Sequence, residues 1–543
     1  MTVRVLVDAG VRRAFTVAGD SFLELLDALR AEPLTTLVTA RLESGAAFMA
    51  EAEGKLREVP ALLLGGPGPG IANFLVAARS AAQDGTPLVV LVEERASVRL
   101  SGPGIQDIPA EPDPLDLFGP FAKWVGRAET AAQVPVLAAR AARAARDGRK
   151  GPAVLAVPAD FWVAPFDGAI PPAVPPPDDA GAVLRSAHEV AALLADSRYP
   201  VVIAGGVGRT ARKDLVAAAE QLGLAVYTAF RRQDSFPENH PRYAGNLGVG
   251  IPAGQLDALE RADVVLAIGT RLDEVTTQNH RYPSPAQTLV VIGPGLPATH
   301  RRGLTFRVDC EIGPFLKQLV SVGVARSRRG SAANAATHTH MTPPSTSPDH
   351  PLVHPADVVR VLREVAPEDT VVTADSGKTA RFVHRYWCFT EPHTQIEAPE
   401  GVRGYAVPAA LGVKLAAKKR TVVAVVSDAA AMMTGQELET AVRYRAPILV
   451  VVFQNGLYAD IAMHQAAKHG RLSGVAHTAV DFAAWARSFG AAGYTIESPE
   501  QLKPTFKRAL LHQRPSVVDV RTDPDVIDPD TRLSSLFQRA RKS

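Results

Sequence analysis

Short continuous apolar runs alternate with longer segments of helical periodicity along the whole chain. Runs of strand length, rich in Val, Ile and Leu, occupy residues 35–40, 61–66, 87–94, 153–160, 200–206, 263–271, 370–375, 421–428, 448–453 and 516–520. Apolar residues at helical spacing occupy residues 21–30, 44–56, 129–148, 213–223, 435–444 and 501–512. Continuous Val/Ile runs between amphipathic helices are typical of parallel sheets covered on both faces. The pattern therefore predicts an α/β protein with three doubly wound parallel-sheet domains in series.

Two breaks in composition divide the 543 residues. Residues 167–182 contain a proline run that cannot join a sheet ladder, and residues 325–350 are rich in Ser, Thr, Ala and Pro without apolar periodicity. We therefore expect an N-terminal domain over 1–166, a central domain over 184–324, a linker over 325–350 and a C-terminal domain over 351–535. The linker histidines indicate a solvated tract rather than a metal site, because no cysteine or carboxylate cluster accompanies them: His338, His340 and His350.

Composition excludes several classes of protein. Apolar residues make up 46% and charged residues 21%, as in globular proteins rather than disordered ones. A net charge of +3 without a basic stripe argues against a nucleic-acid partner. No apolar run reaches the ~18 residues that span a bilayer, and the N-terminus lacks the pattern of a signal peptide. The two cysteines, Cys310 and Cys388, exclude a disulfide framework. We expect a cytoplasmic protein with no membrane partner.

The most specific chemistry follows two apolar runs in the last third. Asp428 ends the run 421–428, and Asn455 follows the run 448–453, with Gly456 and Leu457 directly after it. Ligands of parallel sheets bind beyond the carboxyl ends of strands, where helix N-termini favour anions. Carboxylate, amide and carbonyl oxygens are magnesium ligands. The spacing indicates a magnesium-diphosphate anchor; the alternative is that Asp428 is an N-cap and Asn455 a turn residue.

The segment around these residues resembles a known motif. Residues 427–458 are similar to the thiamine-diphosphate motif, usually Gly-Asp-Gly followed after some 25 residues by Asn-Asn, of the acetolactate synthase, pyruvate oxidase and benzoylformate decarboxylase superfamily. Further segments resemble other elements of that superfamily in the same order, over nearly the whole chain: residues 19–21, 41–43, 68–73, the region of Asp273 and residues 404–410. The ordered set is specific, whereas one piece alone is weak. A dinucleotide fingerprint at 68–70 is the alternative there, but no acidic residue closes a following strand in the expected register.

The resemblance implies roles for individual residues. Glu43 would contact the aminopyrimidine ring of thiamine diphosphate and activate the cofactor by acid–base catalysis, for which it should be buried. Its alternative is a first-turn Glu stabilised by the helix dipole. Asp428, Asn455 and the Leu457 carbonyl would hold Mg²⁺. The residues implied to contact the cofactor are Gly19, Asn73, Gly377, Lys378, Arg403, Ser427, Ala429 and Ala430, and those on the substrate side are Gln106, Arg403 and His464. For Lys378, Arg403, Gln106 and His464 a solvated surface position stays the alternative.

In this superfamily the cofactor lies between the first domain of one subunit and the third domain of another. The resemblance therefore implies a homodimer as the minimum active unit, with a homotetramer as a common state. Some members also bind FAD or a nucleotide in the central domain, and the glycines at 205–208 follow a predicted strand there. Flavin is thus a possible additional cofactor.

The sequence departs from the motif at several positions. Ser427 and Ala429 replace the two glycines around the metal Asp, and Gln454 replaces the first Asn of the pair. Ala18, Leu42 and Ala431 replace the usual Pro, His and aromatic residue. If position 427 or 429 required a left-handed backbone or a close approach to phosphate, a side chain would cost about 1–2 kcal/mol. We expect weakened rather than abolished cofactor binding.

These observations predict a thiamine-diphosphate- and magnesium-dependent lyase or transferase, an acetolactate synthase-like decarboxylase or carboligase of 2-oxo acids. The altered motif motivates an alternative of another class, a degenerate non-catalytic paralogue that serves as a binding or regulatory subunit. A weaker alternative is a flavin- or nucleotide-binding protein. Which 2-oxo acid is used depends on loops that the pattern does not determine.

Overall fold

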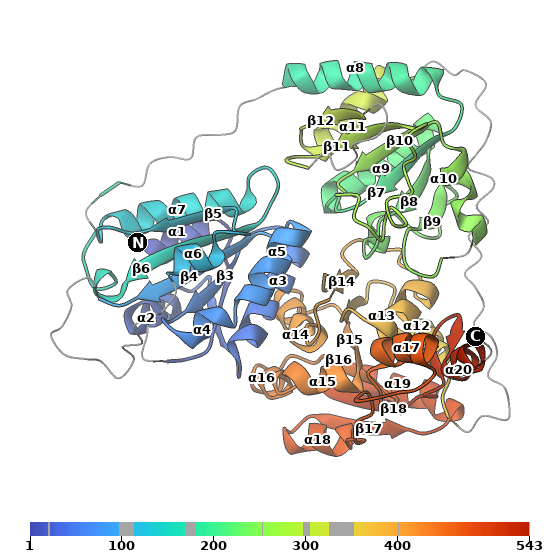
Figure 1. The fold of residues 1–543 in the computed structure, drawn as a ribbon. Coiled ribbons are helices and arrows are strands. Elements are labelled where there is room, and N and C mark those ends of the chain that lie inside the picture. The colour runs from blue at the N-terminus through green and yellow to red at the C-terminus, as the bar shows by residue number, and fades with distance from the viewer. Residues whose placement is uncertain are drawn as a thin grey trace.

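We describe the fold from a computed structural model. It describes residues 1–19, 22–96, 113–166, 168–169, 180–251, 253–296, 305–324, 352–399 and 401–541. Three six-stranded sheets follow one another along the chain, each with all its strands parallel and with helices on its faces (Figure 1). The predicted class, three α/β domains in series, is confirmed.

The first sheet has the order β2-β1-β3-β4-β6-β5. Its strands are β1 (Arg13–Thr16), β2 (Thr36–Thr39), β3 (Ala61–Gly65), β4 (Leu88–Glu94), β5 (Trp124–Arg127) and β6 (Pro152–Pro158). Its helices are α1 (Thr2–Asp8), α2 (Leu23–Ala31), α3 (Glu43–Arg57), α4 (Pro69–Ala72), α5 (Leu75–Asp84), α6 (Pro114–Phe118) and α7 (Gln133–Arg146). The strands β1, β2 and β3 end beside one another, so the segments that follow them meet at one sheet edge.

The central sheet has the order β12-β11-β10-β7-β8-β9. Its strands are β7 (Pro200–Ala204), β8 (Ala225–Thr228), β9 (Tyr243–Asn246), β10 (Val264–Ile268), β11 (Thr288–Ile292) and β12 (Thr305–Val308). Its helices are α8 (Ala180–Asp196), α9 (Arg209–Leu222), α10 (Asp257–Arg261) and α11 (Ile312–Val322). The loop after β8 attaches this domain to the third one, because Asp234 accepts a hydrogen bond of 3.0 Å from the Thr394 N–H and the Gln233 N–H donates to Gln395 across 2.7 Å.

The third sheet has the order β14-β13-β15-β16-β18-β17. Its strands are β13 (Val371–Ala374), β14 (Gln395–Glu397), β15 (Val422–Ser427), β16 (Leu449–Gln454), β17 (Ala492–Ile496) and β18 (Ser516–Arg521), and a separate antiparallel pair comprises β19 (Val526–Asp528) and β20 (Thr531–Arg532). Its helices are α12 (Pro355–Val365), α13 (Lys378–Tyr386), α14 (Ala406–Ala416), α15 (Asp428–Thr434), α16 (Glu437–Arg443), α17 (Ala459–His469), α18 (Phe482–Ser488), α19 (Leu502–Leu510) and α20 (Leu533–Ala540).

Burial explains which strands the sequence pattern predicted. β15 and β16 lie in the middle of their sheet, are covered on both faces and consist almost entirely of apolar residues. The strands β5, β12 and β17 form sheet edges, are only partly buried and carry polar residues, so they have no continuous apolar run. No helix within the described ranges is both long and apolar enough to cross a membrane.

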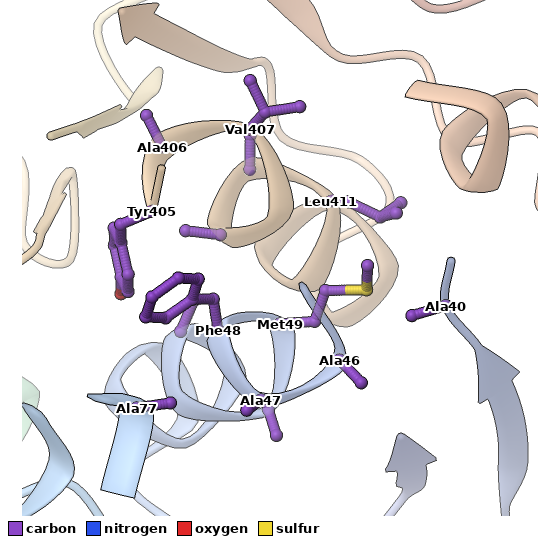
Figure 2. Close-up of a cluster of buried hydrophobic side chains, with 14 of the residues drawn as sticks. Ala40, Ala46, Ala47, Phe48, Met49, Ala77, Tyr405, Ala406, Val407 and Leu411 are labelled. Atoms are coloured by element: carbon purple, nitrogen blue, oxygen red, sulfur yellow. The ribbon is translucent and has the colours of Figure 1, made fainter. Parts of the chain in front are cut away.

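The first and third domains share a hydrophobic core through α3 and α14. Figure 2 shows Phe48 and Met49 of α3 directed toward Tyr405 and Leu411 of the α14 segment. The Phe48 and Tyr405 rings meet edge to face, with centroids 5.4 Å apart. Gly412 permits this approach, because a Cβ there would overlap the Met49 backbone. The two domains of one chain therefore pack as a single unit.

Candidate functional site

A buried carboxylate joins the ends of two neighbouring strands of the third sheet. β15 and β16 are paired in parallel, with Ser427 opposite Phe453, so Asp428 and Asn455 follow them at the same edge, as the spacing predicts. Asp428 is 2% exposed. Its carboxylate accepts hydrogen bonds from the N–H groups of Ala429 (2.8 Å), Asn455 (3.0 Å) and Gly456 (2.8 Å). Asp428 thus fixes the loop that carries the other predicted metal ligands.

The electrostatics of Asp428 favour a cation nearby. Burial raises the pKa of the Asp428 carboxyl, while the three N–H donors and the neighbouring His477 act in the opposite direction. A buried carboxylate with a raised pKa gains stability in its ionised form when a divalent ion binds to it.

The loop after β16 has the donor chemistry of an oxygen-ligated metal site. The Asn455 side-chain oxygen accepts a 3.1 Å hydrogen bond from the Leu457 N–H, and Gly456 takes the left-handed conformation, with φ of 70°. Within the described residues, no three His, Cys, Asp or Glu side chains gather as a metal site. A metal at Asp428 would thus need the amide oxygen of Asn455 and the Leu457 carbonyl. This set suits Mg²⁺, so the residues present fit the predicted ion.

The turn at the start of α15 differs from the alternative interpretation in which Asp428 caps the helix. Ser427 is the N-cap, and its hydroxyl accepts a hydrogen bond of 3.3 Å from the Ala430 N–H. Asp428 is the first helical residue, so the alternative in which it is the N-cap is wrong. Ser427 has φ of −77°, and neither position 427 nor position 429 has positive φ. The backbone therefore needs no glycine here, and the cost of a left-handed backbone does not arise.

A chain of charged side chains lies at the same edge of the sheet. Lys378 is 5% exposed and donates to Asp528 across 3.1 Å, and its ammonium lies 3.6 Å from the Asp460 carboxylate. The alternative of a surface lysine is wrong. Arg403 is exposed, and its guanidinium donates to Asp460 across 2.8 Å, so its head group is paired at the surface. Gly377 faces this pair, because a Cβ there would lie 3.8 Å from Arg403.

Asp375 supports the segment that carries Arg403. Its carboxylate accepts hydrogen bonds from the N–H groups of Tyr405 (2.6 Å) and Ala406 (3.0 Å) at the start of α14. Burial raises the pKa of Asp375 to about 6, although these N–H groups and Arg403 oppose the shift. The strand-end loop of β13 and the turn before α14 are thus held together.

Glu43 lies at the corresponding edge of the first sheet. The Asn73 side-chain amide donates to its carboxylate across 3.0 Å, and a Cβ at Gly70 would lie 3.5 Å from it. The structure therefore brings together the predicted segments 41–43 and 68–73. Gly19 is exposed after β1, the strand between β2 and β3, whereas the following positions 20 and 21 lie outside the described residues.

The exposure of Glu43 differs from the expectation. Glu43 is half-buried, and its hydrogen bond with Asn73 is exposed. In one chain the Glu43 carboxylate is therefore not enclosed. The turn before it is fixed by the third domain, because buried Glu437 of α16 accepts hydrogen bonds of 3.1 Å from the N–H groups of Arg41 and Leu42.

The remaining predicted residues are not gathered around Asp428 by any contact. His464 is exposed on α17, and Gln106 lies outside the described residues, as does the linker 325–350 with its three histidines. Across the described part of the chain, the hydrogen bonds and ion pairs of Glu43 and those of Asp428 share no partner. The described contacts of one chain therefore do not link these two groups.

The sequence pattern missed three residues that contact the predicted residues or segments: Asp460, His477 and Glu437. Asp460 stands five positions after Asn455, close enough for the motif to have drawn attention to it. His477 and Glu437 reach their partners only through the fold, and no local spacing identifies them.

A separate cavity of about 400 Å³ lies where the three domains meet, away from Asp428. The segment at 205–208 borders it, with Gly208 as the N-cap of α9 at φ of 72°. Its basic lining residues outnumber its acidic ones; the basic ones are Lys55, Arg149, Lys150, Arg212, Arg231, Arg232 and Arg271. The central-domain glycines at which the resemblance allows a flavin or nucleotide thus border this cavity.

Comparison with known proteins covers most of the chain. Three family models match: the N-terminal TPP binding domain of thiamine pyrophosphate enzymes over residues 1–114, the central domain over 187–319 and the C-terminal TPP binding domain over 375–520. The sulfoacetaldehyde acetyltransferase of Castellaniella defragrans is 28% identical, with 98% of this chain and 94% of that protein covered. The acetolactate synthase of Bacillus subtilis is 28% identical (96% and 92% covered), and the probable acetolactate synthase large subunit of Methanocaldococcus jannaschii is 26% identical (99% and 95% covered).

Proposed function

The chain belongs to the thiamine pyrophosphate enzyme superfamily, with acetolactate synthase-like relatives, and from this premise we propose that it is a thiamine-diphosphate- and magnesium-dependent enzyme that decarboxylates or ligates 2-oxo acids. One observation carries the proposal. The buried Asp428 carboxylate, held by the N–H groups of Asn455 and Gly456, offers an anionic anchor at the ends of two adjacent strands.

The residues of this chain suit both Mg²⁺ and thiamine diphosphate. Asp428, Asn455 and the Leu457 carbonyl would hold Mg²⁺, and the start of α15 with Gly377 and Lys378 would face the diphosphate. When bound, thiamine diphosphate supplies the carbon nucleophile that attacks a 2-oxo acid and takes up the bonding electron pair that stays behind when carbon dioxide leaves.

Glu43 would hold or move a proton at the aminopyrimidine end of the cofactor. The Asn73 amide fixes one carboxylate oxygen of Glu43, and the other oxygen lies beside Gly70. Glu437 supports this arrangement through the backbone of Arg41 and Leu42.

The charges of Arg403 and Lys378 suit an anionic substrate. Arg403, where relatives by resemblance carry an apolar residue, shares Asp460 with Lys378. An arriving carboxylate can compete with Asp460 for the Arg403 guanidinium, which binds planar carboxylates well. His464 and Gln106 are further candidates for the substrate side.

Two copies of the chain would complete each site. Glu43 and Asp428 share no partner within the described part of one chain, and the Glu43 hydrogen bond is exposed. Apolar side chains are exposed near Asp428, namely Met432 and Met433 on α15 and Tyr458 and Ile461 beside the metal loop. Burial of this surface against the first domain of a second copy would enclose the Glu43 side chain of that second copy. We therefore include a homodimer or homotetramer in the proposal.

Thermal unfolding in the presence of ligands tests the proposal. Millimolar thiamine diphosphate with Mg²⁺ should raise the unfolding temperature of the wild type, because ligands that bind only the folded state stabilise it. Asp428→Asn should remove this shift, and carbon dioxide should be released from at least one member of a 2-oxo acid panel by the wild type alone. Absence of any shift at millimolar ligand would contradict the proposal.

The non-catalytic paralogue is the second candidate, and the Ser427–Ala430 hydrogen bond favours it. This bond occupies an N–H that would otherwise face the diphosphate. A paralogue would bind cofactor weakly or not at all and release no carbon dioxide from the whole panel. The names of the matched families and relatives mention no flavin, so flavin is not part of the proposal.

A further inference from the structure

The imidazole ring of His477 lies beside Asp428, the carboxylate that is predicted to bind the metal. Its Nε2 lies 3.5 Å from the Asp428 Oδ1. This Nε2 is buried and has no hydrogen-bond partner. A buried ring nitrogen without a partner is costly, and each such case needs an explanation such as a missing ion.

Backbone hydrogen bonds and a ring contact hold His477 in this position. The His477 N–H donates to the Gly456 carbonyl across 3.0 Å, and the Tyr458 N–H donates to the Val475 carbonyl across 2.8 Å, so the two segments form an antiparallel bridge. The His477 ring also packs edge to face on Tyr458, with centroids 5.4 Å apart. His477 is thus tied to the same loop that presents Asn455 and Leu457.

The separation of the two donor atoms suits one shared ion. Ligands about 2.1 Å from a metal lie about 3 Å apart at a right angle and about 3.5 Å apart at a tetrahedral angle. The Asp428 Oδ1 accepts one hydrogen bond, from the Ala429 N–H, and retains a lone pair. An ion between Asp428 and His477 would give the His477 Nε2 a partner and would use the remaining lone pair of the Asp428 Oδ1.

We propose that His477 is an additional metal ligand, so that this site prefers divalent ions that accept imidazole, such as Mn²⁺, Co²⁺ or Ni²⁺, more strongly than an all-oxygen site does. This inference rests on the proposed function, because it concerns the metal at Asp428. Imidazole suits first-row transition metals, whereas Mg²⁺ prefers oxygen ligands throughout. His477 would occupy a coordination position that water otherwise fills.

Metal titration of the full-length protein with thiamine diphosphate tests this inference. Calorimetry with Mg²⁺, Mn²⁺ and Co²⁺ gives the affinity ratio of Co²⁺ to Mg²⁺. His477→Phe keeps a ring against Tyr458 and removes the nitrogen; His477→Asn keeps a polar donor. His188→Ala, an exposed histidine on α8, is the control. We expect the ratio to fall at least tenfold in His477→Phe, less in His477→Asn and not at all in His188→Ala, with a shift of the visible Co²⁺ absorption bands in the two His477 variants.

The outcomes separate the two proposals. A ratio that changes less than threefold in His477→Phe, with unaltered Co²⁺ bands, would overturn the role of His477 and leave the metal site at Asp428 intact. If the wild type binds none of the three metals, or Asp428→Asn binds them equally well, the proposed function fails at the same time. Circular dichroism and gel filtration of each variant verify that it is folded.

Discussion

The Asn73 side chain donates a 3.0 Å hydrogen bond to the Glu43 carboxylate, and this bond joins the segments that follow β2 and β3. The two residues are 30 positions apart in the sequence. The contact leaves one carboxylate oxygen available at the sheet edge. It gives Glu43 a fixed orientation without burying it within one chain.

Glu43→Gln should reduce turnover of the best 2-oxo acid by about 10²–10⁴-fold, the usual contribution of acid–base catalysis. The amide has nearly the same shape, so the unfolding temperature and the shift with thiamine diphosphate and Mg²⁺ should persist. Steady-state kinetics measure the effect, with the exposed Glu24→Gln on α2 as the control. Full activity of Glu43→Gln would exclude a catalytic role.

Ser427→Gly should strengthen cofactor binding. The change removes the acceptor of the Ala430 N–H, which then faces the diphosphate. Replacement of an N-cap by glycine costs only a few tenths of a kcal/mol, so the fold should tolerate it. We expect a roughly three- to tenfold lower Kd for thiamine diphosphate by calorimetry, within the range of one hydrogen bond to a charged group. A higher Kd would show that the serine itself contacts the ligand.

The Arg403–Asp460 ion pair should set the affinity for anionic substrates. Arg403→Met removes the guanidinium and should raise KM about 10–100-fold, the effect of losing a charged hydrogen bond. Asp460→Asn releases Arg403 from its partner and should lower KM. Steady-state kinetics of both variants on one 2-oxo acid measure whether KM rises in Arg403→Met and falls in Asp460→Asn. Equal KM values for the two variants would refute competition between Asp460 and the substrate.

Stability should decrease between pH 5 and pH 8 because of Glu238. This carboxyl accepts hydrogen bonds from Gln233 and Tyr243 (both 2.9 Å), and burial raises its pKa from 4.5 to about 7. At a pH between these two pKa values, the folded state therefore binds more protons than the unfolded state. The free energy of unfolding then falls as the pH rises, by about 3 kcal/mol at most. Glu238→Gln cannot ionise and should show a flatter unfolding temperature over this range. Parallel pH profiles would contradict the assignment.

Gly412→Ala should weaken the α3–α14 contact. A Cβ at Gly412 meets the Met49 backbone, which cannot move without shifting α3. Overpacking of this kind costs about 1–3 kcal/mol. Gly254→Ala is the matched control, because a Cβ there meets nothing within 4 Å. Differential scanning calorimetry should show a lower unfolding temperature for Gly412→Ala only. Equal unfolding temperatures for Gly412→Ala and Gly254→Ala would mean that α3 and α14 can move apart without loss of stability.

Local patterns in the sequence determined the fold class and the order of the motifs. Strands such as β15 and β16 are buried on both faces and therefore need continuous apolar runs, which a reader of the sequence can recognise. The neighbouring positions of Asp428 and Asn455 follow from the same logic, because adjacent parallel strands end at one edge.

Only the tertiary structure decided which side chains meet at that edge. The approach of His477 to Asp428, the pairing of Arg403 with Asp460, the burial of Lys378 and the identity of Ser427 as the N-cap depend on contacts between segments or on backbone angles. Spacing along the chain does not encode such contacts, because side-chain partners are chosen by packing and by the need of buried charges and hydrogen-bonding groups for partners.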